Sequence, residues 1–412
     1  MKFYFHNLKL LNYKEWILLL FPFALLKPSF INIILVLSSF IFIFEIIKNK
    51  NFELVKLKWV YFYLIFIFFN IINAFFASDF LSAIKSSISQ LRFLFFSLFI
   101  YVCIFNIKNF NVILNTWLAL LFFISLDGIY QNFFGVNFFD IQVNPSRISG
   151  LFGNELVLGS YLTFSSIPLF FFHINKIKNY NFFKKIVIIL IYAIIFFTII
   201  ISTERMVTIV SFLCLIFIIT FYLKIKKALM LLTILSIFLS ILYYKNIKFN
   251  QRFNEAFLIL NNFHESSYGR LYESSYKLFK ENIFFGVGLK NYRVDCNKQV
   301  DPRPNSIYQF CSSHPHNLYL ELLSETGLIG FLLFCLSFFY LFLDLKKKMK
   351  LKFKNNYFRD YSFLMYGNFL VIFFFLWPIK TSGSFFTTFN GSFFWFNLGL
   401  ALLILKKNYK NN

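Results

Sequence analysis

Two histidines that directly precede a long apolar run are the residues best suited to proton transfer in this sequence. His314 and His316 stand just before the run that begins at Leu318, where a membrane helix would meet water. Imidazole has an ordinary pKa of about 6.5, and a helix N-terminus disfavours its charged form, so it can take a proton from a hydroxyl at neutral pH. The same position also suits an interfacial residue without chemistry, and Asn317 suits a helix cap.

Three arginines could bind a phosphate-containing group. Arg147 lies in the polar segment 144–151, Arg205 lies in the short turn 202–205, and Arg270 lies near the start of an amphipathic stretch. A guanidinium group stays charged and binds phosphate oxygens with two parallel hydrogen bonds, which suits a lipid diphosphate at a membrane surface. Each arginine taken singly also fits a side chain that reaches from a span end toward the headgroups.

Acidic residues inside apolar runs form a third group of candidates. Asp127, Glu321 and Glu325 are costly in lipid, so we expect them to face the interior of a helix bundle or a wet cavity. Glu321 and Glu325 lie one helical turn apart on the His316 side of the run, where either could orient an imidazole. Both carboxylates could equally serve as structural caps or ion-pair partners.

Two of the five cysteines, Cys296 and Cys311, lie in the same long polar segment. In an oxidising compartment they can pair and close a loop of about 15 residues, which the chain-entropy model values at about 3 kcal/mol. The sequence contains no Cys-x-x-Cys, His-Glu-x-x-His or carboxylate cluster with metal-ligand spacing. We therefore expect neither a metal nor a cofactor.

The composition identifies the elements that must position these residues as membrane helices. Of 412 residues, 58% are apolar and only 14% are charged, and 67 are Phe. No soluble core could bury so much apolar surface, which excludes soluble enzymes, disordered chains and disulfide scaffolds. The net charge of +23 does not indicate nucleic acid, because the basic residues gather in short segments between apolar runs, as they do in cytoplasmic loops.

Apolar runs of about 20 residues predict an all-α integral membrane protein, because only helices satisfy their own backbone groups in lipid. We expect about twelve transmembrane helices. Their approximate positions are 16–26, 30–47, 59–77, 91–107, 112–130, 156–174, 186–202, 206–223, 228–244, 318–343, 363–379 and 393–405. Lysine-rich connections alternate with lysine-poor ones, so the positive-inside rule predicts that both termini are cytoplasmic.

One predicted outside segment, 245–315, is much longer than the others. It contains ten Lys and Arg against six Asp and Glu, an excess that suggests an anionic ligand. Within it, the spacing of Leu271, Ser275, Leu278 and Phe279 predicts an amphipathic helix over 266–281. The chain therefore divides into nine helices over 1–244, a periplasmic loop over 245–315, and three helices with a cytoplasmic tail over 316–412.

The histidine segment resembles the O-antigen ligase family (WaaL-type), within a wider group that contains Wzy-type O-antigen polymerases and protein O-oligosaccharyltransferases. The family's loop pattern His-[Asn/Ser/Gln]-x9-Gly-x-x-[Gly/Thr/Tyr] is met by His316, Asn317, Gly327 and Gly330. This pattern is fairly specific, although it covers only a short part of the chain.

Further similarity lies outside the histidine segment. The family's Arg-x3-Leu pattern is met by Arg147 and Leu151, a pattern that occurs often by chance. The stretches 147–154 and 286–288, and the layout of twelve spans with one large late periplasmic loop, also look like the family. By topology the resemblance covers most of the chain.

The resemblance implies a GT-C-like glycosyltransferase that moves a glycan from undecaprenyl diphosphate to a sugar hydroxyl of lipid A-core, without metal or nucleotide. The site would face the periplasm at the bacterial inner membrane. His316 would be the general base, and arginines would hold the diphosphate and stabilise its leaving charge. The implied diphosphate-binding residues are Arg147, Arg205 and Arg270, the further substrate-binding candidates are His314 and Asn317, and the supporting residues are Glu321 and Glu325.

Three other functions stay open at the level of sequence. A Wzy-type polymerase would use the same donor with a second lipid-linked glycan as acceptor, and it often has Arg-x10-Gly patterns. Here Gly159 is one residue off that spacing from Arg147, and Arg270 has no such glycine. The remaining alternatives are a protein O-oligosaccharyltransferase and a lipid-linked glycan transporter without chemistry.

Overall fold

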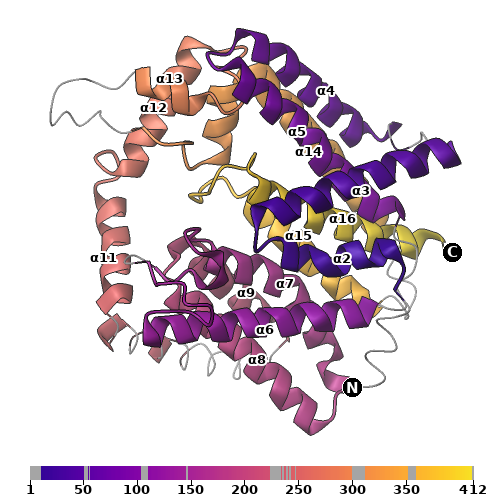
Figure 1. Cartoon of the computed structure of the whole chain (residues 1–412), viewed down its shortest axis with the longest axis vertical. Coiled ribbons are helices and arrows are strands. Elements are labelled where there is room, and N and C mark those ends of the chain that lie inside the picture. The colour runs from indigo at the N-terminus through magenta and orange to yellow at the C-terminus, as the bar shows by residue number, and fades with distance from the viewer. Residues whose placement is uncertain are drawn as a thin grey trace. The chain divides into compact units, whose positions relative to one another are not determined.

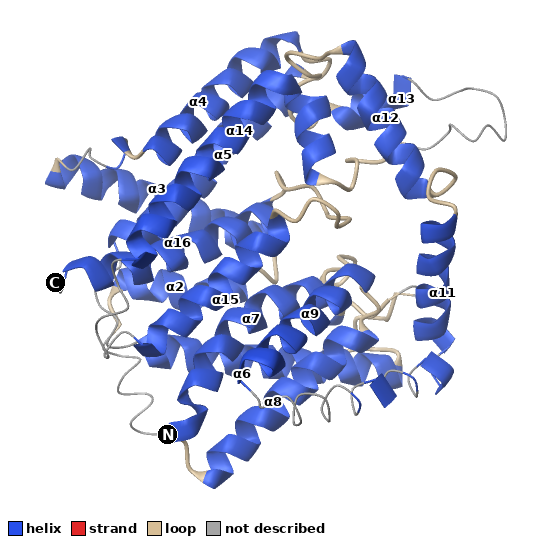
Figure 2. Cartoon of the chain, turned by 180° about the vertical axis from the view of Figure 1, so that it is seen from behind, coloured by secondary structure: helices blue, strands red, loops and turns tan. Residues whose placement is uncertain are grey.

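The computed structural model shows a helical protein (Figures 1 and 2). Within the described residues there is no strand, and one isolated bridge joins Val136 to Gln142. The residues described are 11–50, 54, 56–103, 110–144, 147–222, 233, 236–237, 240, 243–245, 247–298, 311–350 and 359–410.

The helices have the following bounds in chain order. They are α2 (Tyr13–Ala24), α3 (Pro28–Asn49), α4 (Lys58–Asn73), η2 (Ala74–Phe76), α5 (Phe80–Cys103), α6 (Phe110–Phe134), η3 (Gly150–Phe152), α7 (Leu158–Lys176), η4 (Ile177–Asn179), α8 (Phe182–Ile201), α9 (Arg205–Tyr222), α11 (Ile247–Asn261), α12 (Ser267–Glu281), α13 (Tyr292–Lys298), α14 (Leu318–Lys350), α15 (Arg359–Phe375) and α16 (Thr388–Lys410).

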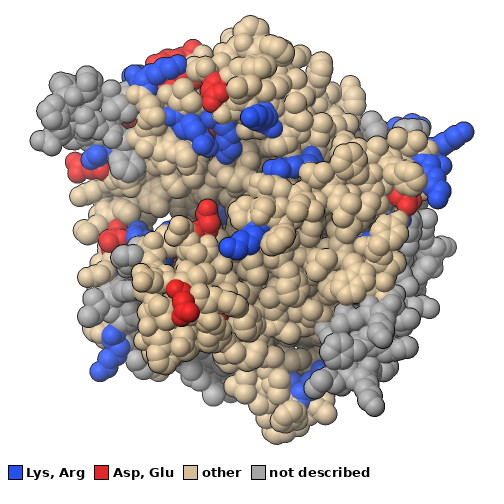
Figure 3. Space-filling model, in the orientation of Figure 1, with Lys and Arg blue, Asp and Glu red and all other residues tan. Residues whose placement is uncertain are grey.

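The predicted all-α membrane fold is confirmed, and the count of twelve spans stays a prediction. Seven helices among the described residues are long and apolar enough to cross a membrane, and two shorter apolar stretches cover Arg205–Phe217 and Tyr361–Phe375. The predicted span 228–244 lies mostly outside the described residues. Most of the face drawn in Figure 3 carries neither cationic nor anionic side chains, as expected for a surface that contacts lipid.

The chain forms two compact units, each assembled from separate stretches of sequence. The first, called unit 1, contains residues 1–12, 108–261 and 366–374, and the second, called unit 2, contains 13–107, 262–365 and 375–412. Unit 1 packs α6, α7, α8 and α9 against one another. In it the Thr198 hydroxyl of α8 lies 3.3 Å from the Ser125 carbonyl of α6, and the rings of Phe196 and Phe212 join α8 to α9 at 5.0 Å.

Unit 2 is built on α4, α5, α14 and α16. Figure 1 shows α4, α5 and α14 running side by side, and α14 packs along α4 while α16 packs along α5. Aromatic side chains fill the space between these helices: the Tyr63 ring of α4 lies 4.7 Å from Trp395 of α16 and 6.5 Å from Phe338 of α14. Tyr63 and Trp395 are almost completely buried, so the abundant aromatics form the core of this unit as well as its lipid-facing surface.

Helix α14 is interrupted at Gly327, where the backbone has φ 61° and ψ −171°. The segment 283–288 crosses this break and supplies the hydrogen bonds that the helix lacks. Its N–H groups at Val287 and Gly288 donate to the carbonyls of Ser324 and Glu325 at 2.9 and 2.8 Å. A broken helix is tolerated at membrane depth only where its backbone groups find such partners.

Close backbone contact at this crossing explains why two positions, Gly286 and Gly327, are occupied by glycine. A Cβ added to Gly327 would lie 2.4 Å from the Phe284 carbonyl, and one added to Gly286 would lie 2.5 Å from the Gly327 nitrogen. Both positions also have positive φ, which L-residues with side chains rarely adopt. The glycines of the two sequence patterns thus pack against each other and hold the 283–288 segment on α14.

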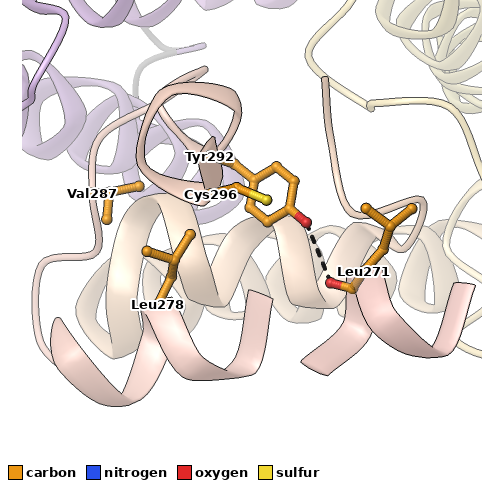
Figure 4. Packing of buried hydrophobic residues seen from close by; sticks show 5 residues of the cluster. All are labelled: Leu271, Leu278, Val287, Tyr292 and Cys296. Carbon is orange, nitrogen blue, oxygen red and sulfur yellow. Dashed lines mark hydrogen bonds between the residues drawn. The ribbon is translucent and has the colours of Figure 1, made fainter. Parts of the chain in front are cut away.

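The predicted amphipathic helix is confirmed as α12, which begins after the N-cap Ser266. Its buried face includes Leu271, Ser275 and Leu278, as the sequence spacing indicated, whereas Phe279 of the predicted face is only half-buried. Leu271 and Leu278 pack with Val287 of the crossing segment and with Tyr292 and Cys296 of α13 (Figure 4). A disulfide joins Cys296 to Cys311, whose Cα atoms are 5.7 Å apart, and so ties α13 to the chain that leads into the histidines.

Candidate active site

The histidine segment is held in a constrained backbone conformation directly before α14. His316 has φ +57°, an uncommon value for a residue with a side chain, and it follows Pro315, which restricts His314 to an extended conformation. The His316 carbonyl accepts a hydrogen bond from the Ser382 N–H at 2.8 Å. Strained backbone of this kind persists where the surroundings over-determine it, and such places are often functional sites.

The two imidazoles lie against each other and against α12. Their ring centroids are 4.1 Å apart, and the ring of Tyr268 stands edge-on to His316 with centroids 5.7 Å apart. His314 Nδ1 is 2.9 Å from the Ser313 hydroxyl. Both histidines are half-buried, and the Nε2 atom of His314 is buried without a hydrogen-bond partner among the described residues.

Burial keeps both imidazoles neutral. Desolvation lowers the pKa of His314 to about 3, His316, Lys290 and Arg293 lower it further, and the backbone of Ser382 opposes the shift. Desolvation also lowers the pKa of His316, but the backbone of Ser382 and the Glu321 carboxylate oppose that effect. At neutral pH both rings are therefore unprotonated, and His316 is the one whose protonated form has an anion to stabilise it.

Asn317 is the N-cap of α14. Its side-chain oxygen accepts from the N–H groups of Tyr319 and Leu320 at 3.0 and 3.2 Å, and its amide donates to the Pro378 carbonyl at 2.8 Å. These bonds satisfy orphan donors of the first helical turn. They also fasten α14 to the loop before α16, so the capping role considered from the sequence accounts for this residue.

Glu321 lies in the first turn of α14, in a buried network. Its carboxylate accepts hydrogen bonds from the hydroxyl of Ser384 and from the Phe385 N–H at 3.1 Å. Lys290 Nζ donates to the same Ser384 hydroxyl and lies 3.7 Å from the carboxylate. The network joins α14, the 282–291 segment and the loop 376–387, three parts of the chain that are far apart in sequence.

Glu325, one turn further along α14, has a different environment. It is fully buried, and its backbone carbonyl accepts from Gly288 at the helix break. Neither of its buried carboxylate oxygens has a hydrogen-bond partner among the described residues. Both glutamates point inward as expected, but Glu321 is the one that acts electrostatically on His316.

Arg270 lies on α12, two residues after the Tyr268 that contacts His316. Its side chain is half-buried. The histidine segment and this arginine therefore share unit 2. Arg147 and Arg205 belong to unit 1, and their convergence with His316 stays a prediction.

In unit 1, buried polar side chains of α6 hold the loop that carries Arg147. The Asp127 carboxylate accepts from the Phe138 N–H at 2.9 Å, and the Gln131 oxygen accepts from the N–H groups of Ser149 and Gly150 at 2.9 and 2.8 Å. Asp127 is fully buried, which confirms that it faces the bundle. Gln131 gave no signal in the sequence, because the loop it anchors lies 18 residues away.

The predicted turn between α8 and α9 is confirmed, and it brings a buried carboxylate close to Arg147. Glu204 accepts from the Gly159 N–H at 2.7 Å and from the Ser160 hydroxyl at 2.7 Å, which caps α7. Burial raises the pKa of Glu204, whereas the Ser160 hydrogen bond and the charge of Arg147 oppose that rise. Arg205, the next residue, donates to Glu255 of α11 at 2.5 Å.

Within each unit, then, the structure gathers several of the predicted residues. Unit 2 brings together His314, His316, Asn317 and Glu321, and unit 1 brings Arg147 close to the turn that carries Arg205. Among the described residues no three His, Cys, Asp or Glu side chains are grouped as metal ligands would be. Sequence reasoning missed two members of the histidine site, Lys290 and Ser384. A single lysine and a single serine in polar segments form no distinguishing pattern.

Comparison with known proteins identifies the segment that contains this site. No curated protein matches the chain significantly. Residues 187–335 match the O-antigen ligase family, a group of ligase- and polymerase-type proteins of lipopolysaccharide biosynthesis that handle glycan and lipid substrates. The matched segment contains Arg205, Arg270 and His316, whereas Arg147 and Ser384 lie outside it. The chain is therefore similar to the O-antigen ligase family over the segment that contains His316.

Proposed function

We propose that this protein transfers a glycan from undecaprenyl diphosphate to a sugar hydroxyl of lipid A-core at the periplasmic face of the inner membrane. The observation that carries the proposal is the neutral, half-buried His316 at the start of a membrane helix, with a buried carboxylate in the first turn of that helix. A base for a sugar hydroxyl must be unprotonated at neutral pH, and its protonated form must be stabilised as the reaction proceeds. The family match supports a glycan and a lipid as the substrates.

The transfer needs one proton acceptor and one site for a leaving diphosphate. His316 takes the proton of the acceptor hydroxyl while that oxygen forms a bond to the anomeric carbon of the donor glycan. The bond between this carbon and the diphosphate oxygen breaks, and its electron pair leaves with the undecaprenyl diphosphate. Guanidinium groups stabilise the charge that develops on the leaving oxygens, and the role falls to Arg147, Arg205 and Arg270.

A complementation assay tests this function against its alternatives. The gene is expressed in a strain that makes O-antigen but lacks its own ligase, and lipopolysaccharide is separated on a gel. Restoration of the ladder of capped core bands supports ligation. A strain lacking only its polymerase would instead regain the ladder if the protein were a Wzy-type polymerase. Modified periplasmic protein without either effect would identify a protein O-oligosaccharyltransferase, and export of lipid-linked glycan without any transfer would identify a transporter.

Arg147→Lys should reduce transfer strongly even though it keeps the positive charge. A lysine ammonium cannot make the paired hydrogen bonds of a guanidinium group, so it stabilises the leaving diphosphate less well. We expect a rate loss of about 10-fold or more, measured with purified protein and lipid-linked donor. Arg92→Lys on α5 is the control, because that side chain hydrogen-bonds Asn32 and Thr388 and has no role in the proposed diphosphate site. Wild-type transfer by Arg147→Lys would contradict diphosphate clamping by this residue.

A further inference from the structure

We infer that Lys290 and Ser384 are positioning residues of the transfer site, which hold in place the Glu321 carboxylate that stabilises protonated His316. The inference rests on the proposed function and adds to it two residues from outside the histidine segment. Neither residue contacts a substrate in this scheme. They act through the carboxylate between them.

Hydrogen bonds form a continuous path from the Lys290 ammonium to the Glu321 carboxylate. Lys290 Nζ donates to the Ser384 hydroxyl, and that hydroxyl donates to Glu321 Oε1. The second carboxylate oxygen of Glu321 accepts from the Phe385 N–H at 3.1 Å. Both oxygens are thus fixed by donors from the loop 376–387, the same loop whose Ser382 N–H donates to the His316 carbonyl.

Because the Glu321 carboxylate is buried, it needs the nearby Lys290 cation to balance its charge. Lys290 is 9% exposed and Glu321 is 1% exposed. A carboxylate so far from water remains ionised only if a cation or several donors replace its hydration, and it otherwise takes up a proton. The Lys290 backbone is also in the left-handed region, at φ +63°, which indicates that the surrounding structure holds this lysine in place at an energetic cost.

The groups around the two imidazoles assign them different tasks. His314 is close enough to Lys290 and Arg293 for both cations to act on it, and Glu321 acts on His316. The ring of Tyr268 on α12 lies edge-on to His316. Opposite electrostatic environments for two neighbouring groups separate the residue that accepts a proton from the residue that stays neutral. His316 is the acceptor, and His314 is a neutral neighbour.

The test follows the protonation of His316 independently of transfer. Diethyl pyrocarbonate modifies neutral imidazole, so the pH dependence of labelling at His316 in the purified full-length protein, resolved by peptide fragmentation in a mass spectrometer, gives its titration midpoint. Glu321→Gln removes the anion and should move this midpoint to lower pH. Lys290→Met should move it in the same direction, because the buried Glu321 carboxyl then takes up a proton. Transfer should fall about 10-fold in both variants, less than on removal of the base itself.

Three further variants separate positioning from a purely structural role. Lys290→Arg keeps the cation and should retain the wild-type midpoint, and Lys277→Met, on the exposed face of α12, should change nothing. Ser384→Ala breaks the path without changing any charge and should give a smaller shift in the same direction. This variant decides the question if Lys290→Met does not fold.

The results also separate this inference from the proposed function. A midpoint that stays in place or moves to higher pH in Lys290→Met, while Glu321→Gln moves it downward, overturns the role of Lys290. An unchanged midpoint in folded Ser384→Ala overturns the role of Ser384. If the expected shifts occur but His316→Ala still transfers glycan at the wild-type rate, the network exists and the proposed function is wrong.

Discussion

Replacing His316 with Ala is expected to reduce glycan transfer by about 10²- to 10⁴-fold, because the acceptor hydroxyl loses the base that removes its proton. The ring is half-buried and neutral at pH 7, and Glu321 is placed to stabilise its protonated form. The loss should appear in kcat with purified protein, lipid-linked donor and core acceptor. A transporter would keep partial activity with this variant, so the size of the loss also separates chemistry from transport.

The control for His316→Ala is His264→Ala. His264 lies just before α12 in the same unit and is exposed, so its loss should leave the rate unchanged. The pH profile gives a second check. Activity should fall below the pKa of His316, which burial lowers from its ordinary value, so transfer should persist in mildly acidic solution. Near-wild-type transfer by folded His316→Ala would rule out the proposed base.

Gly327→Ala is expected to destabilise the protein by about 2 to 6 kcal/mol, through backbone strain and steric clash together. With φ 61° and ψ −171°, this residue occupies a region that is almost exclusive to glycine. Its new Cβ would lie 2.4 Å from the Phe284 carbonyl, which belongs to the segment bonded across the helix break. The measurements are the thermal midpoint in detergent and the folded fraction on size-exclusion chromatography.

Gly135→Ala separates the two causes. Gly135 follows α6 with φ +78°, and a Cβ there would meet nothing within 4 Å. This variant therefore carries conformational strain without a clash and should cost only about 1 kcal/mol. If Gly327→Ala were no worse than Gly135→Ala, the close crossing of segment 283–288 over α14 would not be a determinant of stability.

The family pattern that includes Gly327 has a structural cause that the sequence does not reveal. The spacing from His316 to Gly327 was found as a family pattern. The structure shows that Gly327 is the break in α14 and that Gly286, some 40 residues earlier in the chain, packs against it. A glycine required by contact with distant backbone cannot be explained from neighbours in sequence, because the partner is chosen by tertiary packing.

The sequence by itself determined the elements of this protein. Apolar runs of membrane length specified helices, the spacing of Leu271, Ser275 and Leu278 specified α12 and its buried face, and the turn 202–205 was evident between two runs. These features depend on the periodicity of apolar residues and on the need of the backbone to satisfy its hydrogen bonds in lipid. Both can be judged from residues that are neighbours in the sequence.

Only the tertiary structure decided which polar groups surround His316. Glu321 was recognised because it lies one turn from the histidine segment, whereas Lys290 and Ser384 reach it from 31 and 63 residues away. Likewise, Arg205 pairs with Glu255, 50 residues further along. Hydrogen bonds and ion pairs act over a few ångströms in space and carry no trace in sequence spacing, so their partners are known only once the helices have packed.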